Sequence, residues 1–167
     1  MVSRRTPIVL FNLLKSFGST FFDITRINEN LYLSGEYNQN DLITIHKLGI
    51  NCVIDMRSEE SFDKLLFSNL GIDYHNIPVD NFFPPDEDKT NQAIDIIDKH
   101  AKSNQKVLVH CKEGVGRSPY ILAAYMIKNG DSVYESIAFI KSKRWGVNLN
   151  KIQMRSIKKF YEKSTFD

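Results

Sequence analysis

The feature that most constrains the fold is the apolar run Val107-Leu108-Val109-His110, which is followed directly by a loop with two glycines. An unbroken apolar run of this length predicts a strand buried on both faces, as in a parallel sheet covered by helices. Gly114 and Gly116 allow the loop to turn tightly. Pro119 is then well placed in the first turn of a helix. The segment therefore predicts a strand, a tight loop and a helix in succession.

Strand-like and helix-like segments alternate along the rest of the chain. This alternation predicts an α/β domain with a central, mostly parallel twisted sheet flanked by helices on both faces, and a length of 167 residues suits one such domain. Asn40 or Asp41 is predicted to cap the first helix. Ser132 and Glu135 have the spacing of a capping box. The predicted strands are 31–33, 52–56, 74–79 and 107–110, and the predicted helices are 42–48, 94–101, 119–127, 133–140 and 150–162.

Composition excludes several classes of protein. Apolar residues make up 42% and charged residues 25%, which argues against disorder, and a net charge of +2 gives no nucleic-acid signature. Cys52 and Cys111 are the two cysteines, too few for a disulfide framework, which predicts a reducing compartment such as the cytoplasm or nucleus. Residues 141–167 carry eight basic and two acidic residues, typical of solvated helix faces or of a surface that attracts anions.

The N-terminal segment has a different character. The apolar run 7–14 follows Arg4 and Arg5 and is interrupted by Lys15, so it is too short to span a membrane. We expect residues 1–24 to be an extension that packs on the domain or docks a partner, with an interfacial helix as the alternative. The catalytic domain is expected to comprise residues 25–167.

The loop from Cys111 to Arg117 carries the chemistry. Backbone N–H groups that point into a glycine-containing loop, above a helix N-terminus, form a site for phosphate. The same field stabilises a thiolate at Cys111 and so makes it a nucleophile. The planar guanidinium of Arg117 can bind two phosphate oxygens. Together these groups predict attack of sulfur on phosphorus.

The sequence His110-Cys111-Lys112-Glu113-Gly114-Val115-Gly116-Arg117-Ser118 resembles the signature of the cysteine-dependent protein tyrosine phosphatase superfamily: His-Cys, five residues, Arg, then Ser or Thr. The segment 27–35, and Lys143-Arg144 followed by Asn148 and a final helix, are similar to the dual-specificity branch. The resemblance covers residues 25–162. It implies the fold of these phosphatases and hydrolysis of phosphoproteins through a phosphocysteine, with no metal and no cofactor.

The resemblance also implies roles for individual residues. Cys111 is the nucleophile, and Ser118 helps to expel the thiolate, caps the helix, or does both. His110 supports the loop through hydrogen bonds. Arg117 holds phosphate together with the backbone of the loop, which comprises Lys112, Glu113, Gly114, Val115 and Gly116.

A leaving oxygen needs a proton, which a carboxylic acid on a nearby loop can supply. The family pattern places this acid at a strand end about thirty residues before the cysteine. Asp80 lies 31 residues before Cys111 and ends the predicted strand 74–79. Asp86, Glu87 and Asp88 are the alternatives, with Asp86 and Asp88 preferred among them.

Several other side chains have alternative assignments. Arg57 orders the loop, contacts the substrate, or forms a surface ion pair with Glu59 or Glu60. Cys52 is expected to be buried and inert, or to form a protective disulfide with Cys111 after oxidation. Candidates to orient water or to shape the rim of the site are Asn148, Gln153, Phe82, Phe83, Tyr120 and Trp145.

The substrate is expected to be a phosphoprotein, with phosphotyrosine first and phosphoserine and phosphothreonine also accepted. The negative charge of Glu113 disfavours a polyanionic head group. Two alternatives stay open: a phosphatase of phosphoinositides or other non-protein phosphate monoesters, and a phosphoprotein-binding module without turnover.

Overall fold

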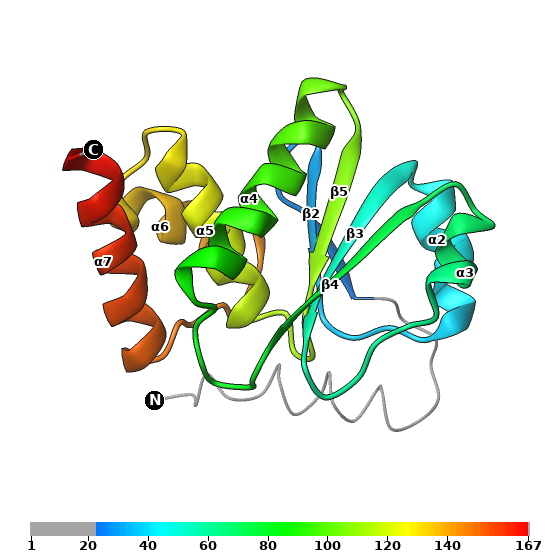
Figure 1. The fold of residues 1–167 in the computed structure, drawn as a ribbon, viewed down its shortest axis with the longest axis horizontal. Coiled ribbons are helices and arrows are strands. Elements are labelled where there is room, and N and C mark those ends of the chain that lie inside the picture. The colour runs from blue at the N-terminus through cyan, green and yellow to red at the C-terminus, as the bar shows by residue number, and fades with distance from the viewer. Residues whose placement is uncertain (1–22, 167) are drawn as a thin grey trace, which may run out of the picture.

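The computed structural model describes residues 23–166 and builds them around a five-stranded sheet (Figure 1). Its strand order is β1-β2-β5-β3-β4, in which β1 pairs antiparallel with β2 and the other neighbours pair in parallel. The predicted mostly parallel sheet is thereby confirmed. The predicted extension falls almost entirely on residues 1–22, outside the described part. The strands are β1 (Ile24–Arg26), β2 (Leu31–Ser34), β3 (Ile50–Arg57), β4 (Asp73–Val79) and β5 (Lys106–His110).

Helices cover both faces of the sheet, as the alternation predicted (Figure 1). The short helices α2 and α3 lie on one side, and α4 to α7 lie on the other. Within residues 23–166, none of the helices has the length and apolar character needed to cross a bilayer. The bounds are η1 (Gln39–Asp41), α2 (Leu42–Lys47), α3 (Lys64–Ser68), α4 (Glu87–Lys102), α5 (Arg117–Lys128), α6 (Val133–Lys143) and α7 (Lys151–Phe166).

Strands β5 and β3 are largely apolar because each of their faces packs on a separate core. In β5, Val107 and Val109 pack into the core under α4 to α7, whereas Leu108 packs into the core under α2 and α3. In β3, Ile54 packs into the core under α4 to α7, and Val53 packs into the core under α2 and α3. Side chains alternate across a strand, so a strand buried on both sides has apolar residues at successive positions rather than at every second one.

The structure adds elements that periodicity did not predict. Strand β1 and helix α3 have three and five residues, too few to give a repeating pattern. The first helical segment is also capped differently from the prediction. Asn38 accepts a hydrogen bond from the Asn40 backbone and forms a capping box with Asp41, while Asp41 makes no side-chain cap for α2.

The carboxyl ends of three neighbouring strands meet at one edge of the sheet. Strand β3 ends at Arg57, β4 at Val79 and β5 at His110, and the register pairs Arg57 with Val79. In parallel sheets, ligand sites lie at this edge, since the following loops converge there. The loops 58–63, 80–86 and 111–116 are therefore brought together.

The predicted capping box at the start of α6 gives a direct test of local stability. The Ser132 hydroxyl accepts from the Glu135 backbone at 3.2 Å, and the Glu135 carboxylate accepts from the Ser132 backbone at 2.9 Å. Ser132→Ala should lower the free energy of unfolding by about 1 kcal/mol in urea denaturation. Ser142→Ala in the same helix is the control, with an expected change within about 0.5 kcal/mol. Equal effects of the two substitutions would contradict the capping role.

Candidate active site

Cys111 lies directly after β5, at the bottom of the predicted phosphate loop. Its side chain is buried, and its sulfur accepts hydrogen bonds from the Gly114 backbone N–H at 3.3 Å and from the Ser118 hydroxyl at 3.1 Å. Two donors aimed at one sulfur stabilise negative charge on it. The structure therefore brings together the predicted nucleophile and the predicted hydroxyl.

The outer side of the loop is fixed by hydrogen bonds to its carbonyl groups. The Glu36 backbone N–H donates to the Lys112 carbonyl at 2.7 Å, and the Asn148 N–H donates to the Val115 carbonyl at 3.0 Å. Arg144 donates from Nε to the Gly114 carbonyl at 2.8 Å and from Nη2 to the Glu113 carbonyl at 3.3 Å. Four consecutive carbonyl groups, 112–115, thus point away from the centre of the loop.

This arrangement determines where the N–H groups point. In a trans peptide, the carbonyl of one residue and the N–H of the next point in opposite directions, and the described backbone contains no cis bond. The N–H groups of residues 113–116 therefore point toward the inside of the loop, on the side of the Cys111 sulfur. An inward ring of N–H groups is a phosphate cradle.

Gly114 is required for this shape. Its φ is +66°, and a Cβ there would come within 2.7 Å of the Gly35 backbone nitrogen and of the Ser34 carbonyl carbon. A side chain would push the loop off the segment that follows β2. Gly116 faces Gln153 instead, with Nε2 at 3.2 Å from an added Cβ.

Arg144 was not predicted to act in the site, although it was part of the resemblance. It is buried, and Nη1 donates to Asp23 at 2.9 Å and to Thr25 at 3.0 Å, while Nη2 also donates to Asp23. It thus joins the start of β1 to the loop, and it lies 30 residues from Gly114 and 121 residues from Asp23 in sequence. Its contacts come from tertiary structure, so spacing could not reveal them.

Arg117 is held from one edge. Nη1 and Nη2 each donate to one oxygen of Glu59 at 2.7 Å, and Nη1 also donates to the Val79 carbonyl at 2.8 Å. Among the described residues, no acceptor takes the Nε hydrogen or the second Nη2 hydrogen. These two lie on the same edge of the guanidinium, in the geometry that binds two oxygens of one anion.

Glu59 is a site residue that the sequence analysis placed only as a possible partner of Arg57. The hydrogen bond from Arg117 lowers the pKa of this carboxyl to about 2, against the opposing effect of its partial burial. Arg57 is not on the surface but buried, and it pairs with Asp55 at 2.9 Å and with Glu60 at 3.1 Å. No short-range pattern connects Glu59 with Arg117, which is 58 residues away.

His110 ends β5, directly before the loop, and its ring is fully buried. Nε2 lies 3.5 Å from an oxygen of Asp55, and the ring packs at 4.6 Å from that of Tyr37. Burial, which outweighs the attraction of Asp55, lowers the pKa of His110 to about 4. The residue is therefore a neutral packing element at neutral pH.

The candidate acids occupy distinct positions. Asp80 follows Val79, whose carbonyl binds Arg117, and its side chain is exposed. Asp86 is the N-cap of α4 and accepts from the Lys89 backbone at 2.8 Å. Asp88 lies in the first turn of α4. Asp80 is thus the candidate placed next to the arginine, whereas Asp86 already has a structural partner.

The loop that carries Asp80 is attached to the start of α7. Asn150 Nδ2 donates to the Phe82 carbonyl at 2.7 Å, and Gln153 Nε2 donates to the Phe83 carbonyl at 3.4 Å. Phe82 has φ +68°, which is strained for a residue with a side chain. Gln153 is buried between this loop and Gly116, so it connects the two loops rather than facing solvent.

Of the four aromatic candidates for the rim, three are exposed and one is buried. Phe82, Phe83 and Trp145 are exposed at 70%, 55% and 57%. Tyr120 is buried and bonds Ser156 at 2.9 Å, so it belongs to the core. Asn148 has an exposed side chain, and it acts on the loop through its backbone.

The disulfide alternative for Cys52 is excluded by the register. Cys52 pairs with Val107, and Cys111 lies four residues further along the same direction, roughly 13 Å at the rise of a strand. A disulfide requires Cα atoms within about 7 Å. Both cysteines are free and buried.

Comparison with known proteins agrees with this geometry. The family model "Dual specificity phosphatase, catalytic domain" matches residues 31–163, and the chain therefore belongs to the dual-specificity branch of the cysteine-dependent protein tyrosine phosphatase superfamily. Protein phosphatase Slingshot homolog 1 of Homo sapiens is 31% identical over 142 residues, 80% of this chain. The match spans only 13% of that relative's own length.

Two further relatives differ from Slingshot in how much of their own length is matched. Phosphatidylglycerophosphate phosphatase PTPMT2 of Arabidopsis thaliana is 28% identical over 159 residues, 92% of this chain and 70% of that protein. The crystal structure of PTPMT1 in complex with PI(5)P superposes with a TM-score of 0.80 at 23% identity, covering 85% of this chain and 96% of the other. This likeness shows the shared fold.

The Glu59–Arg117 pair predicts an effect on anion binding. Glu59→Gln should weaken binding of tungstate, a tetrahedral oxyanion, by about tenfold, since an amide can accept only one of the two bonds that orient Arg117. Calorimetric titration measures the dissociation constant. Glu60→Gln is the matched control, because Glu60 pairs with Arg57 instead. An unchanged affinity in Glu59→Gln would show that backbone contacts such as the Val79 carbonyl suffice to orient Arg117.

The neutral His110 predicts a loss of stability in acid. Its folded pKa, about 4, lies below the unfolded value, so the folded state binds fewer protons between the two. Stability should be complete above about pH 6.5 and fall by roughly 3 kcal/mol as pH decreases toward 4. Urea denaturation at several pH values measures this slope. His110→Gln should flatten it, and His46→Gln, at an exposed position, should not. Equal slopes in all three proteins would contradict the assignment.

Proposed function

We propose that this chain hydrolyses phosphate monoesters on proteins, phosphotyrosine first and phosphoserine or phosphothreonine second. The reaction proceeds through a phosphocysteine on Cys111. The observation that carries the proposal is the position of Arg117, which presents two adjacent donors next to a ring of inward backbone N–H groups and a hydrogen-bonded sulfur. These groups match the tetrahedral oxygens of a phosphate that is being attacked.

In the first step, the Cys111 thiolate forms a bond to phosphorus while the bond from phosphorus to the leaving oxygen breaks. Asp80 gives its proton to that oxygen. Arg117 and the N–H groups of residues 113–116 hold the remaining oxygens. The charge that develops in the transition state is thus neutralised by groups already in place.

In the second step, water attacks the phosphocysteine. Asp80, now a carboxylate, takes a proton from the water, and the sulfur–phosphorus bond breaks. The Ser118 hydroxyl, at 3.1 Å from the sulfur, stabilises the thiolate as it leaves. Inorganic phosphate is released, and Cys111 returns to its starting state.

The surroundings of the loop support a peptide substrate. Exposed Phe82, Phe83 and Trp145 offer apolar surface for peptide side chains or for the ring of phosphotyrosine. The exposed carboxylate of Glu113 on the loop repels substrates with several phosphates. Since both cysteines are free, we place this activity in a reducing compartment, the cytoplasm or the nucleus.

A phospholipid monoester is the second candidate substrate. It is supported by PTPMT2, whose name states a phosphatidylglycerophosphate phosphatase and which matches 92% of this chain. The same exposed aromatic side chains can contact acyl chains. Glu113 argues against this substrate, because the lipid brings further negative charge to the loop.

The test is hydrolysis of a phosphotyrosine peptide, a phosphothreonine peptide and phosphatidylglycerophosphate, each with chelator present. We expect the phosphotyrosine peptide to give the highest kcat/KM. Cys111→Ser should abolish turnover of all three. Binding of phosphopeptide without any turnover would replace the enzyme by a binding module, and preference for the lipid would reverse the substrate assignment.

Asp80→Asn should lower kcat on the phosphotyrosine peptide by about 10²- to 10⁴-fold, the usual contribution of a general acid. The effect should be smaller on para-nitrophenyl phosphate, whose leaving group needs little protonation. Asp86→Asn is the control, because Asp86 caps α4. A large loss in Asp86→Asn with little loss in Asp80→Asn would assign the acid to Asp86.

A further inference from the structure

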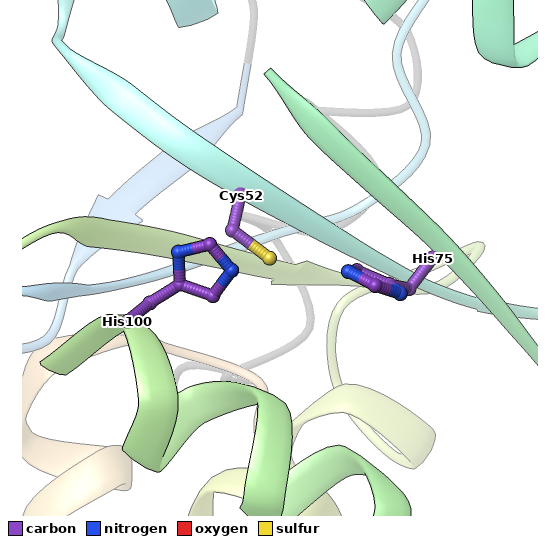
Figure 2. Close-up of side chains that lie close together, drawn as sticks. All are labelled: Cys52, His75 and His100. Atoms are coloured by element: carbon purple, nitrogen blue, oxygen red, sulfur yellow. The ribbon is translucent and has the colours of Figure 1, made fainter.

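The structure brings together three metal-ligand side chains that the phosphatase mechanism does not use: Cys52, His75 and His100 (Figure 2). One donor atom from each lies within 4.8 Å of the other two. Figure 2 shows the Cys52 sulfur, from β3, directed between the imidazoles of His100, from α4, and His75, from β4. One of the two cysteines and two of the four histidines in the chain thus share one small volume.

The sheet register explains why Cys52 and His75 meet. Cys52 pairs with Asp73 and Ile54 pairs with His75, so these side chains lie on the same face of two adjacent strands. That face is the one covered by α4, which places His100 over Cys52. Three segments distant in sequence therefore supply one ligand each.

His100 is oriented as a metal ligand would be. Its Nδ1 lies 2.7 Å from Gln105 Oε1, which can only accept, so Nδ1 carries the hydrogen. The lone pair of the neutral ring is then on Nε2. This atom is buried and has no hydrogen-bond partner among the described residues, although His100 is only 3% exposed. A second partner that fixes the tautomer is typical of histidines bound to metal.

We propose that Cys52, His75 and His100 form a binding site for a divalent transition metal, with Zn²⁺ as the best match. Thiolate and imidazole are its preferred ligands, and three protein ligands leave one position for water or a carboxylate. Asp73 is the nearest carboxylate, with Oδ2 at 3.5 Å from His100 Nε2. Tetrahedral zinc separates its ligand atoms by roughly 3.5 Å, so small side-chain movements close the site.

Binding requires the Cys52 thiol to lose its proton to solvent as the sulfur–metal bond forms. Burial, together with the charge of Asp73, raises the pKa of the Cys52 thiol to about 12, so the bound cation must supply the opposite field. Burial lowers the pKa of His75, which keeps that ring neutral and able to donate a lone pair. The positive charge of Lys99 weakens binding of a cation here, and the negative charge of Asp73 strengthens it.

The metal has a route to the site from the surface. A shallow hollow of about 530 Å³ runs along α4 and is lined in part by His75, Asp88, Asp95 and Lys99. His75 is only half-buried, so it connects this hollow with the buried sulfur. The site lies toward the amino ends of the strands, whereas Cys111 lies at the carboxyl end of β5. Occupancy of this site can therefore be measured separately from the phosphate loop.

The experiment is a titration of the metal-free full chain with Co²⁺ and then Zn²⁺, in a phosphine reductant that adds no competing thiol. Thiolate-to-cobalt charge transfer reports a sulfur ligand directly. We expect one equivalent to bind, with the band present in Cys111→Ser and absent in Cys52→Ser. A band that is lost in Cys111→Ser and kept in Cys52→Ser would place the metal at the phosphate loop and overturn the proposal, as would no band at all.

A second variant tests the site independently, in case Cys52→Ser does not fold. His75→Asn, at a half-buried position, should weaken Co²⁺ binding at least tenfold while circular dichroism stays unchanged. His46→Asn is the matched control on α2 and should bind as the wild type does. Zn²⁺ at a hundredfold excess over its dissociation constant should raise the Tm by roughly 5 to 10 °C in wild type and His46→Asn. Equal affinity and equal Tm shifts in His75→Asn would refute the site.

Discussion

The phosphate loop depends on hydrogen bonds made to the outside of its own backbone. Glu36, Arg144 and Asn148 bind the carbonyl groups of residues 112–115, and each bond turns the following N–H inward. The cradle is thus a consequence of contacts from two separate parts of the chain, the segment after β2 and the connection between α6 and α7. Gly114 is needed for this shape, because its positive φ and its close approach to Gly35 leave no room for a side chain.

The charged groups around the loop orient one another through ion pairs. Glu59 binds one edge of Arg117 and leaves the other edge for an anion, so the carboxylate orients the arginine without occupying its phosphate-binding donors. Arg57, which stands at a strand end nearby, is directed to Asp55 inside the protein instead. Buried ion pairs of this kind fix geometry, although the desolvation of both partners limits their net contribution to stability.

The two ends of the sheet carry different sets of functional groups. At the carboxyl ends of β3, β4 and β5, loops converge and create the phosphate site. Toward the amino ends, the pleat places Cys52 and His75 on one face under α4, where His100 completes a set of thiol and imidazole ligands. A metal at this position would join the end of α4 to β3 and to the edge strand β4, and α4 begins directly after the loop that carries Asp80.

Short-range patterns predict the strand-loop-helix unit, the parallel sheet, and Cys111 and Arg117 as candidate nucleophile and phosphate ligand, because apolar periodicity and glycine positions act over short distances. The sequence also indicated Asp80 through its position at a strand end. The contacts of Glu59 and Arg144 with the site, the packing of the buried His110 ring against Tyr37, and the position of Cys52 between two histidines rather than near Cys111 follow from the tertiary structure. These results depend on strand register and on contacts across 30 to 60 residues, which no local pattern encodes.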